Sequence, residues 1–543
     1  MTAESEPLEI VALGGRAGPT RLPRPPFILL APAVLIALAA LSPVAYLLLR
    51  VSEAGGDAFD LILNRRTAET LLRTVLLAGC VSAATIALAL PLAWLTVRTD
   101  LPLRRFWAVV TALPLVIPSY VGAFAFVEGL GPRSLLQQIL APLGVGALPE
   151  IYGFGGAAFT LTLLTYPYVL LSLHTALWGL DPAVEESSRV LGSGAWQTFF
   201  RVTLAQLRPA MAAGGLLVAL YTLADFGAVS ILRFNSFTNV IYLQYQSAFD
   251  RTLAAASSLV LVALALSLLI LEAAARGRSR YYKSTTGTSR RSGLVKLGRW
   301  RWPAAAFCGI VAGLALVLPL SVLAYLVGRG LAADETFSPA WQAARNSMYV
   351  SALAAGVTVL AALPVSLLTV RYAGRWVGGL EQITFLGFSL PGIVVALALV
   401  FFGIRYAPAL YQTLTLLVFA YFVLYLPVAL GPVRTALLQV NPHLEEAARS
   451  LGRRPFAAFV SVTLPLLRPG VVAAAALVFL VTMKELPATL ILGPIGFQTL
   501  ATSTWSAAAA AQDARAAFAA LVLVLVSALP MAAMMYWERR DEW

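Results

Sequence analysis

Long apolar runs separated by short polar loops set the pattern of this 543-residue chain. A helix needs about 20 apolar residues to cross the hydrocarbon core of a bilayer. Windows of that length give twelve candidate spans, at roughly 27–49, 70–97, 106–127, 155–177, 211–232, 253–274, 303–328, 346–370, 382–404, 412–437, 471–492 and 515–537. The pattern therefore predicts an all-α polytopic membrane protein with twelve transmembrane helices.

Composition supports the membrane class. Hydrophobic residues make up 59% of the chain and charged residues only 12%, against about 25% charged residues in soluble domains. The net charge of +13 could indicate nucleic-acid binding, but the basic residues are spread among short loops, which membrane topology explains better. We therefore expect membrane lipid around the chain and no nucleic-acid partner. The two cysteines, Cys80 and Cys308, lie in apolar runs and form no metal-ligand or disulfide pattern.

The basic residues also predict an orientation. Segment 1–26 is polar, and the run 27–49 is too long for a signal peptide and shows no obvious cleavage site. With the N-terminus inside, most of the 39 Lys and Arg residues fall on the cytoplasmic side, as the positive-inside rule expects. Both termini, including the tail 538–543, are therefore expected in the cytoplasm.

A repeated polar segment divides the chain into two halves. Residues 181–208 and 441–468 align without a gap, 260 positions apart, and a second set of matches, which includes Pro118 with Pro391 and Arg98 with Arg371, lies 273 apart. The two spacings differ by 13, which predicts extra residues around 128–155 in the first half. We expect transmembrane domains at 27–274 and 303–537, joined by a basic linker at 275–302. Parallel repeats of this kind enclose a central pathway.

Each copy of the polar segment predicts one short helix. Asp181 and Asn441 are favourable N-caps, each followed by proline at the first helical position. Gly192 and Gly452 are placed to end the helices in a left-handed conformation. One face of each helix is small and apolar, suited to docking on another surface. The spacing also predicts the i,i+4 ion pairs Glu185–Arg189 and Glu445–Arg449.

This segment resembles the EAA loop of ABC-importer permeases, which has Glu-Ala-Ala, three residues and then Gly. The second copy matches at Glu446-Ala447-Ala448 and Gly452, and the first matches more loosely at Glu186-Ser187-Ser188 and Gly192. An ordinary amphipathic loop is the alternative, but chance would have to reproduce the spacing twice. The resemblance implies a coupling helix that inserts into a cytoplasmic ATPase subunit. The implied coupling residues are Glu185, Glu186, Arg189, Gly192, Glu445, Glu446, Ala447, Arg449 and Gly452.

The resemblance also implies a fold and partners. The fold is that of type I importer permeases in the bacterial inner membrane: two parallel-topology six-helix repeats, here fused in one chain. The implied partners are two copies of a cytoplasmic ABC ATPase, which would bind ATP and Mg, and one periplasmic solute-binding protein. None of the three lysines lies in a phosphate-binding loop motif, and the sequence contains no catalytic constellation. We expect no enzyme activity and no cofactor bound by this chain.

Two acidic residues lie at equivalent positions inside apolar spans, Asp225 and Glu485. A charge at that depth is costly, so it normally faces a wet pathway or a partner. We interpret both as candidates for a translocation pathway or gate, with interfacial snorkelling as the alternative. Lys484 adjoins Glu485 and could neutralise it.

The surrounding segments indicate a substrate class. Residues 225–246 and 484–502 resemble fused ferric-iron importer permeases, although similar motifs recur in relatives that import thiamine, phosphonates or sugar phosphates. Ferric ion prefers oxygen ligands, and four residues could supply them: Tyr242, Tyr245, Asp250 and Asp225. An outer aromatic belt is the alternative for both tyrosines. In that family the binding protein recognises the metal, so any metal site in this chain is left open.

Two other functions remain possible interpretations of the sequence, and the role of the linker is open as well. An ion-gradient-driven secondary transporter also has twelve helices in two halves, but it has no need of repeated docking loops. A membrane scaffold without transport activity leaves the paired intramembrane acids unexplained. The linker 275–302, rich in Lys and Arg, is either a flexible tether or a lipid-binding regulatory segment.

Overall fold

The computed structural model describes residues 25–53, 64–132, 134–144, 148–247, 252–277, 294–372, 374–385, 387 and 390–541. Within these ranges the chain is helical, and its one β-type contact is an isolated bridge between Thr99 and Val295. Most of the polar N-terminal segment, most of the basic linker, Asp250 and the last two residues lie outside the described ranges. The all-α prediction is confirmed for the described part of the chain.

Nine of the described helical segments are long and apolar enough to cross a membrane, and a bent pair at 104–116 and 119–143 would make ten. The main helices of these nine are α1 (Phe27–Glu53), α3 (Arg65–Arg98), α7 (Phe154–Gly179), α10 (Leu204–Ala224), α13 (Thr252–Gly277), α14 with α15 (Arg301–Ala312 and Leu318–Ala332), α16 (Ser338–Arg371), α19 (Leu414–Gln439) and α22 (Leu464–Met483). The C-terminal helix, α25, covers Asp513–Asp541. Twelve crossings therefore remain a prediction.

Four of the predicted spans are broken rather than continuous. The breaks separate α4 and η1 (Arg104–Val110, Leu113–Val116) from α5 (Ser119–Leu130), α17 (Arg375–Phe385) from α18 (Gly392–Tyr406), α10 from α11 (Gly227–Ile231), and α22 from α23 (Pro487–Leu492). Pro118 and Pro391 lie at the first two breaks with extended backbone, at φ −60°, ψ 147° and φ −60°, ψ 138°. Proline cannot donate the hydrogen bond that would continue a helix, so these apolar runs bend.

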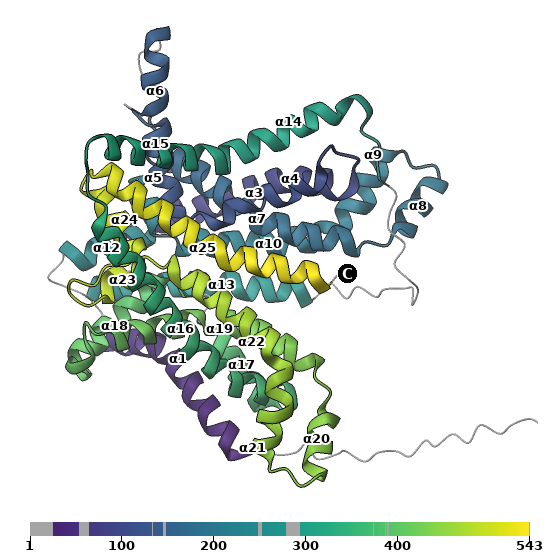
Figure 1. The fold of residues 1–543 in the computed structure, drawn as a ribbon, viewed down its shortest axis with the longest axis vertical. Helices are drawn as coiled ribbons and strands as arrows, with labels where there is room; N and C mark the ends of the chain where they lie inside the picture. Colours follow the sequence, from purple (N-terminus) through teal and green to yellow (C-terminus); the bar gives the residue numbers. More distant parts are fainter. Residues whose placement is uncertain are drawn as a thin grey trace, which may run out of the picture.

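Helix boundaries repeat between the halves. Helices α3 and α16 both have 34 residues, α7 and α19 both have 26, and five-residue π-helical turns recur at Phe199–Thr203 and Phe459–Thr463. The spacing changes between α5 and α7, where the first half carries α6 (Leu135–Leu140). In Figure 1, α6 projects away from the bundle. The predicted position of the extra residues is therefore confirmed.

The first helices of both halves pack across the boundary between the halves. Helix α1 packs mainly against α16, α17 and α18 of the second half, and α15 packs against α5 of the first half as well as against α25 of its own. Figure 1 shows α1 beside α16 and α17, and α14 and α15 along the edge formed by α3, α4 and α5. Cys308 and Val311 of α14 belong to the same buried cluster as Leu77 of α3. Domain limits read from the sequence order therefore do not coincide with packing units, and each half completes the other.

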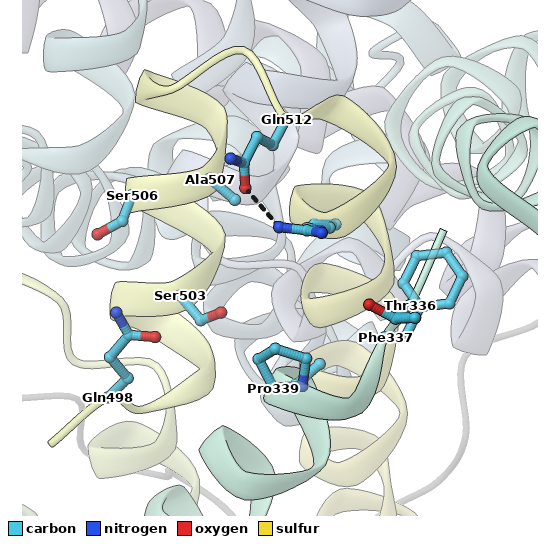
Figure 2. Close-up of a pocket in the computed structure, with 10 residues that line it drawn as sticks. Thr336, Phe337, Pro339, Gln498, Ser503, Ser506, Ala507 and Gln512 are labelled. Atoms are coloured by element: carbon cyan, nitrogen blue, oxygen red, sulfur yellow. Dashed lines mark hydrogen bonds between the residues drawn. The ribbon is translucent and has the colours of Figure 1, made fainter. Parts of the chain in front are cut away.

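The bundle has two distinct ends. Helices α8 (Pro182–Val190) and α20 (Pro442–Ser450) lie at one end, whereas α12 (Phe237–Ser247), α18, α23 and α24 (Leu500–Ala509) lie at the other, on the left in Figure 1. At this second end the start of α16, α24 and the start of α25 line a pocket of mixed polarity (Figure 2), in which Arg515 donates to the side-chain oxygen of Gln512 at 3.3 Å. None of the residues predicted to be functional lines this pocket.

Candidate coupling helices and the seam between the halves

The predicted N-caps and end glycines of the two candidate coupling segments are confirmed. The side chain of Asp181 accepts the backbone N–H of Ala183 at 3.0 Å, and that of Asn441 accepts the N–H of His443 at 3.0 Å. Gly192 and Gly452 both have φ of +88°, a conformation that glycine adopts without strain. Helices α8 and α20 therefore begin and end in the same way, and they are geometrically equivalent elements.

Both helices and the residues after them present uncovered side chains. Glu186, Arg189, Glu446, Ala447 and Arg449 are exposed. Large apolar side chains beside them are exposed too: Leu191 by 85%, Leu451 by 86%, Trp196 by 77% and Phe456 by 76%. Exposed apolar side chains gathered in this way are typical of interaction sites. Each half therefore carries a matched candidate for an apolar docking surface, defined by Leu191 and Trp196 in the first half and by Leu451 and Phe456 in the second.

Glu185 and Glu445 differ from their neighbours because they face the protein. The predicted i,i+4 pairs with Arg189 and Arg449 are wrong, since neither pair occurs among the ion pairs of the described residues. Glu185 instead pairs with Arg98 of α3 and accepts the hydroxyl of Thr203 at 2.8 Å. Glu445 lies 3.5 Å from Arg371 and accepts the hydroxyl of Thr463 at 3.0 Å. The matches Arg98/Arg371 and Thr203/Thr463 in the repeat were the signal for these contacts.

The end of the linker docks onto the first half, a contact that sequence reasoning missed. The N–H of Val295 donates to the carbonyl of Arg98 at 2.8 Å, and the N–H of Asp100 donates to the carbonyl of Val295 at 3.2 Å. Asp100 also pairs with Arg301 and accepts the N–H of Leu297 at 2.8 Å. The hydrogen bond from Arg301, followed by that from Leu297, holds the pKa of the Asp100 carboxyl below its usual range. The described end of the linker is thus attached to the chain beside α8.

Replacing Asp100 with asparagine should release this docked segment. A lowered pKa means that the ionised carboxyl contributes stability at neutral pH, and this stability is lost only as the pH falls below about 4. At pH 7.5 we expect trypsin to cut after Lys296 at least roughly threefold faster in Asp100→Asn than in the unmodified chain. Asp334→Asn, an exposed aspartate at the other end of the bundle, is the control. Equal cleavage rates in both variants would show that the docking does not depend on the Asp100 charge.

Asp225 and Glu485 occupy the breaks after α10 and α22. Asp225 is buried, accepts the hydroxyl of Ser119, and accepts the N–H groups of Ala228 and Val229 at 3.0 and 3.3 Å. Glu485 accepts the hydroxyl of Tyr425 and the N–H of Ala488 at 3.1 Å. Both carboxyls therefore cap the short helices that continue the broken spans, which gives each a structural task that the pattern alone did not indicate.

Lys484 connects the two halves. Its ammonium donates to the backbone carbonyl of Leu115 in η1 at 3.0 Å, a contact between the second half and the first. The ion pairs of the described residues do not include one between Lys484 and Glu485, and the ammonium of Lys484 is directed to the first half instead. Lys484 and Glu485 are both half-buried. We call this region, formed by Leu115, Lys484 and Glu485, the seam.

The two tyrosines lie beyond the seam, on α12. Tyr242 is buried against the rings of Phe226 and Trp505, with centroids at 4.8 and 5.9 Å, and its oxygen accepts the side-chain amide of Gln246 at 2.6 Å. Tyr245 is half-buried against the same core. In the described part of the chain, three or more His, Cys, Asp or Glu residues nowhere come together as they would around a metal ion. Aromatic packing therefore accounts for Tyr242.

Comparison with known proteins agrees with this geometry. The model of the family described as "Binding-protein-dependent transport system inner membrane component" matches residues 85–280 and 362–540. The chain belongs to this family. Each match begins after the first helix of its half and contains one of the two candidate coupling helices, α8 or α20.

Individual relatives support the family assignment. The chain is 37% identical to the Fe(3+)-transport system permease protein FbpB 2 of Haemophilus influenzae, over 94% of this chain and 98% of the relative. It is 28% identical to the ferric transport system permease protein FbpB of Actinobacillus pleuropneumoniae, over 77% and 65%. The molybdenum transport system permease protein ModB of Escherichia coli is 29% identical, over 29% and 69%. This permease is thus homologous to ferric transport system permeases along nearly its whole length.

Family membership fixes the broad role. The chain is a multi-pass inner-membrane permease subunit of an ABC importer, and such subunits are not themselves enzymes. A separate ATPase, which uses ATP and Mg, and a periplasmic binding protein are the partners that this family implies. The ion-gradient-driven transporter and the scaffold are therefore set aside as interpretations.

Proposed function

We propose that this permease forms the translocation pathway for ferric iron that a periplasmic binding protein delivers. The observation that carries the proposal is the 37% identity to an Fe(3+)-transport system permease along 94% of the chain. The same machinery importing thiamine, phosphonate or sugar phosphate is the alternative, because permeases of one fold serve several substrates.

Two copies of the ATPase would bind, one at each coupling helix. The support is the equivalence of α8 and α20, whose caps, end glycines and exposed leucines match. The same surface presented twice suits two copies of one partner. In this proposal α8, α20 and both termini face the cytoplasm, the chain crosses the membrane twelve times in two six-helix repeats, and ATP and Mg bind in the ATPase. The end of α25 on the α8 side in Figure 1 is consistent with that orientation.

The seam would act as the gate. Closure of the ATPase pair would draw α8 and α20 together, and the halves would rotate as rigid bodies. Lys484 and Glu485 supply the charged groups at the seam, and Asp225 holds the corresponding break in the first half. The pathway would then open next to α11 and α23. Tyr242 and Tyr245 on α12 would support this region, and Tyr242 would do so through ring packing.

Reconstitution tests the substrate and the energy source together. Proteoliposomes that contain the permease, its ATPase and the binding protein should accumulate radioactive ferric iron only with ATP inside. Excess thiamine, phosphonate or sugar phosphate should not compete. Competition by one of these would favour that substrate instead, and uptake driven by an ion gradient without the ATPase would contradict the proposal as a whole.

Gly452→Pro should uncouple the second half. Proline fixes φ near −65°, whereas Gly452 has φ of +88°, so the turn that ends α20 cannot form. We expect stimulation of ATP hydrolysis by the loaded binding protein to fall at least roughly tenfold, because the ATPase contact requires this turn. Glu446→Lys, which reverses an exposed charge on the same helix, should weaken stimulation in the same direction.

Chromatography and thermal unfolding would verify that both variants fold. Gly431→Pro is unsuitable as a control because Gly431 lies inside α19. Gly144→Pro is suitable, because Gly144 also has a positive φ, +82°, and follows η2 at the other end of the bundle. Normal stimulation in Gly452→Pro would argue against a coupling role for α20.

A further inference from the structure

Each coupling helix is attached to its own half by the same three side chains. We infer that Arg98 with Glu185 and Thr203, and Arg371 with Glu445 and Thr463, are positioning residues that clamp the coupling helices and carry their motion into the membrane bundle. This inference deepens the proposed function and rests on it. We call these two groups the first and the second clamp.

Three elements meet in each clamp. Arg98 is the last residue of α3, Glu185 lies on α8, and Thr203 ends the π-helical turn that leads into α10. In the second half the same roles fall to the last residue of α16, to α20 and to the turn that leads into α22. A carboxylate on the coupling helix therefore joins the helices on both sides of it.

The difference in exposure among the side chains of α8 and α20 indicates which of them can contact a partner and which contact the helix bundle. Along α8 and α20 most side chains with a described environment are exposed, whereas Glu185 and Glu445, together with Ser188 and Ala448, are half-buried, and Thr203 and Thr463 are buried. The exposed side chains are open to a partner, and the inward carboxylate is held by the bundle. Hydrogen bonds that involve charged groups are stronger and more directional than neutral ones, so the clamp is suited to transmit displacement.

The path from the clamp leads to the seam. Helix α10 (Leu204–Ala224) begins directly after Thr203 and ends directly before Asp225, and α22 (Leu464–Met483) begins directly after Thr463 and ends directly before Lys484 and Glu485. Both helices continue without a break along the described residues between the clamp and the far residue, and each contains one proline, Pro209 in α10 and Pro469 in α22. A continuous helix that is held at one end and caps a break at the other is a physical route for coupling.

The two clamps are not equal. In the first, the side chains of Arg98 and Glu185 are 7% and 18% exposed, and the backbone of Arg98 also accepts the N–H of Val295 from the linker. In the second, Arg371 and Glu445 are 19% and 24% exposed and 3.5 Å apart. The first clamp is thus more buried and is braced by the linker, so we expect its loss to have the larger effect.

The test compares three variants of the full chain, each reconstituted with the ATPase and the binding protein: Arg98→Met, Glu185→Gln and the double variant R98E/E185R. The double variant exchanges the two charged residues and is called the exchange below. Arg98→Met should raise the ATP hydrolysed per iron transported at least roughly fivefold, with ATPase binding unchanged. The exchange should restore the ratio, which a general packing defect would not allow. Arg371→Met should give a smaller rise. Arg105→Met removes an exposed arginine on α4 and is the matched control.

A second measurement needs no ATPase. Spin labels at Arg105 and Val190 report the position of α8 relative to α4, and Arg98→Met should broaden their distance distribution while the exchange narrows it again. An unchanged distribution in Arg98→Met, or an exchange no better than the single variants, overturns the clamp. If the labels respond as expected but the unmodified chain binds no ATPase, the clamp stands as a positioning device and the proposed function fails.

Discussion

Replacing Leu191 and Leu451 with glutamate in the same chain should abolish stable binding of the ATPase, lowering its affinity by more than about a hundredfold. Both leucines directly follow the coupling helices, and they are 85% and 86% exposed in the isolated chain. Full burial of a leucine side chain contributes about 1.5–3 kcal/mol relative to leaving it exposed to water. A carboxylate at that position would have to be buried without a partner, which costs more than the lost contact. Surface biosensor measurements with the permease in nanodiscs would give the affinity.

The single variants and a remote leucine serve as controls. Leu191→Glu and Leu451→Glu alone should each weaken binding in part, because one docking surface remains. Leu143→Glu places the same charge on a leucine that is 77% exposed at the other end of the bundle, and it should leave the affinity unchanged. If the double variant bound the ATPase within about threefold of the unmodified chain, the apolar docking surfaces would not be the site of ATPase attachment.

Features set by neighbouring residues were predictable from the sequence. The caps at Asp181 and Asn441 and the end glycines depend on hydrogen bonds and backbone angles within about ten residues, and the structure has them as expected. The repeat was also visible, because equal spacing of matched residues survives sequence divergence. These local rules do not require knowledge of how helices pack.

Contacts between distant segments were not predictable in the same way. The i,i+4 spacing predicted an ion pair between Glu185 and Arg189. However, Arg98 is buried, and a buried charge requires a partner. Glu185 therefore pairs with Arg98, which is distant in sequence. The average hydropathy of a window along the chain likewise does not reveal the break in the helix at Pro118, because a broken span is as apolar as a continuous one. The packing of α1 and α15 across the boundary between the halves could not be predicted from the order of the apolar runs. Each of these helices is apolar whichever half it packs against.

Lys484→Met should raise ATP hydrolysis in the absence of the binding protein by about tenfold to a hundredfold. The ammonium of Lys484 donates to the carbonyl of Leu115 across the seam at 3.0 Å, and a hydrogen bond that involves a charged group contributes about 1.5–3 kcal/mol. Its removal shifts the equilibrium between arrangements of the halves by the corresponding factor. The ATPase would then cycle without the signal that a loaded binding protein provides. Measuring phosphate release with and without the binding protein gives the size of the shift.

Lys484→Arg separates the loss of this contact from a change in packing. Arginine keeps the positive charge and can donate to a backbone carbonyl, so basal hydrolysis should stay within about threefold of the unmodified chain. Methionine and lysine have similar length, so Lys484→Met should preserve the apolar contacts of the stem. If both variants showed the same basal hydrolysis as the unmodified chain, the Lys484–Leu115 contact would not restrain the halves. The restraint would then have to lie in the apolar packing between the halves, where Leu486 of the second half lies beside Gly227 of α11 and Tyr120 of α5.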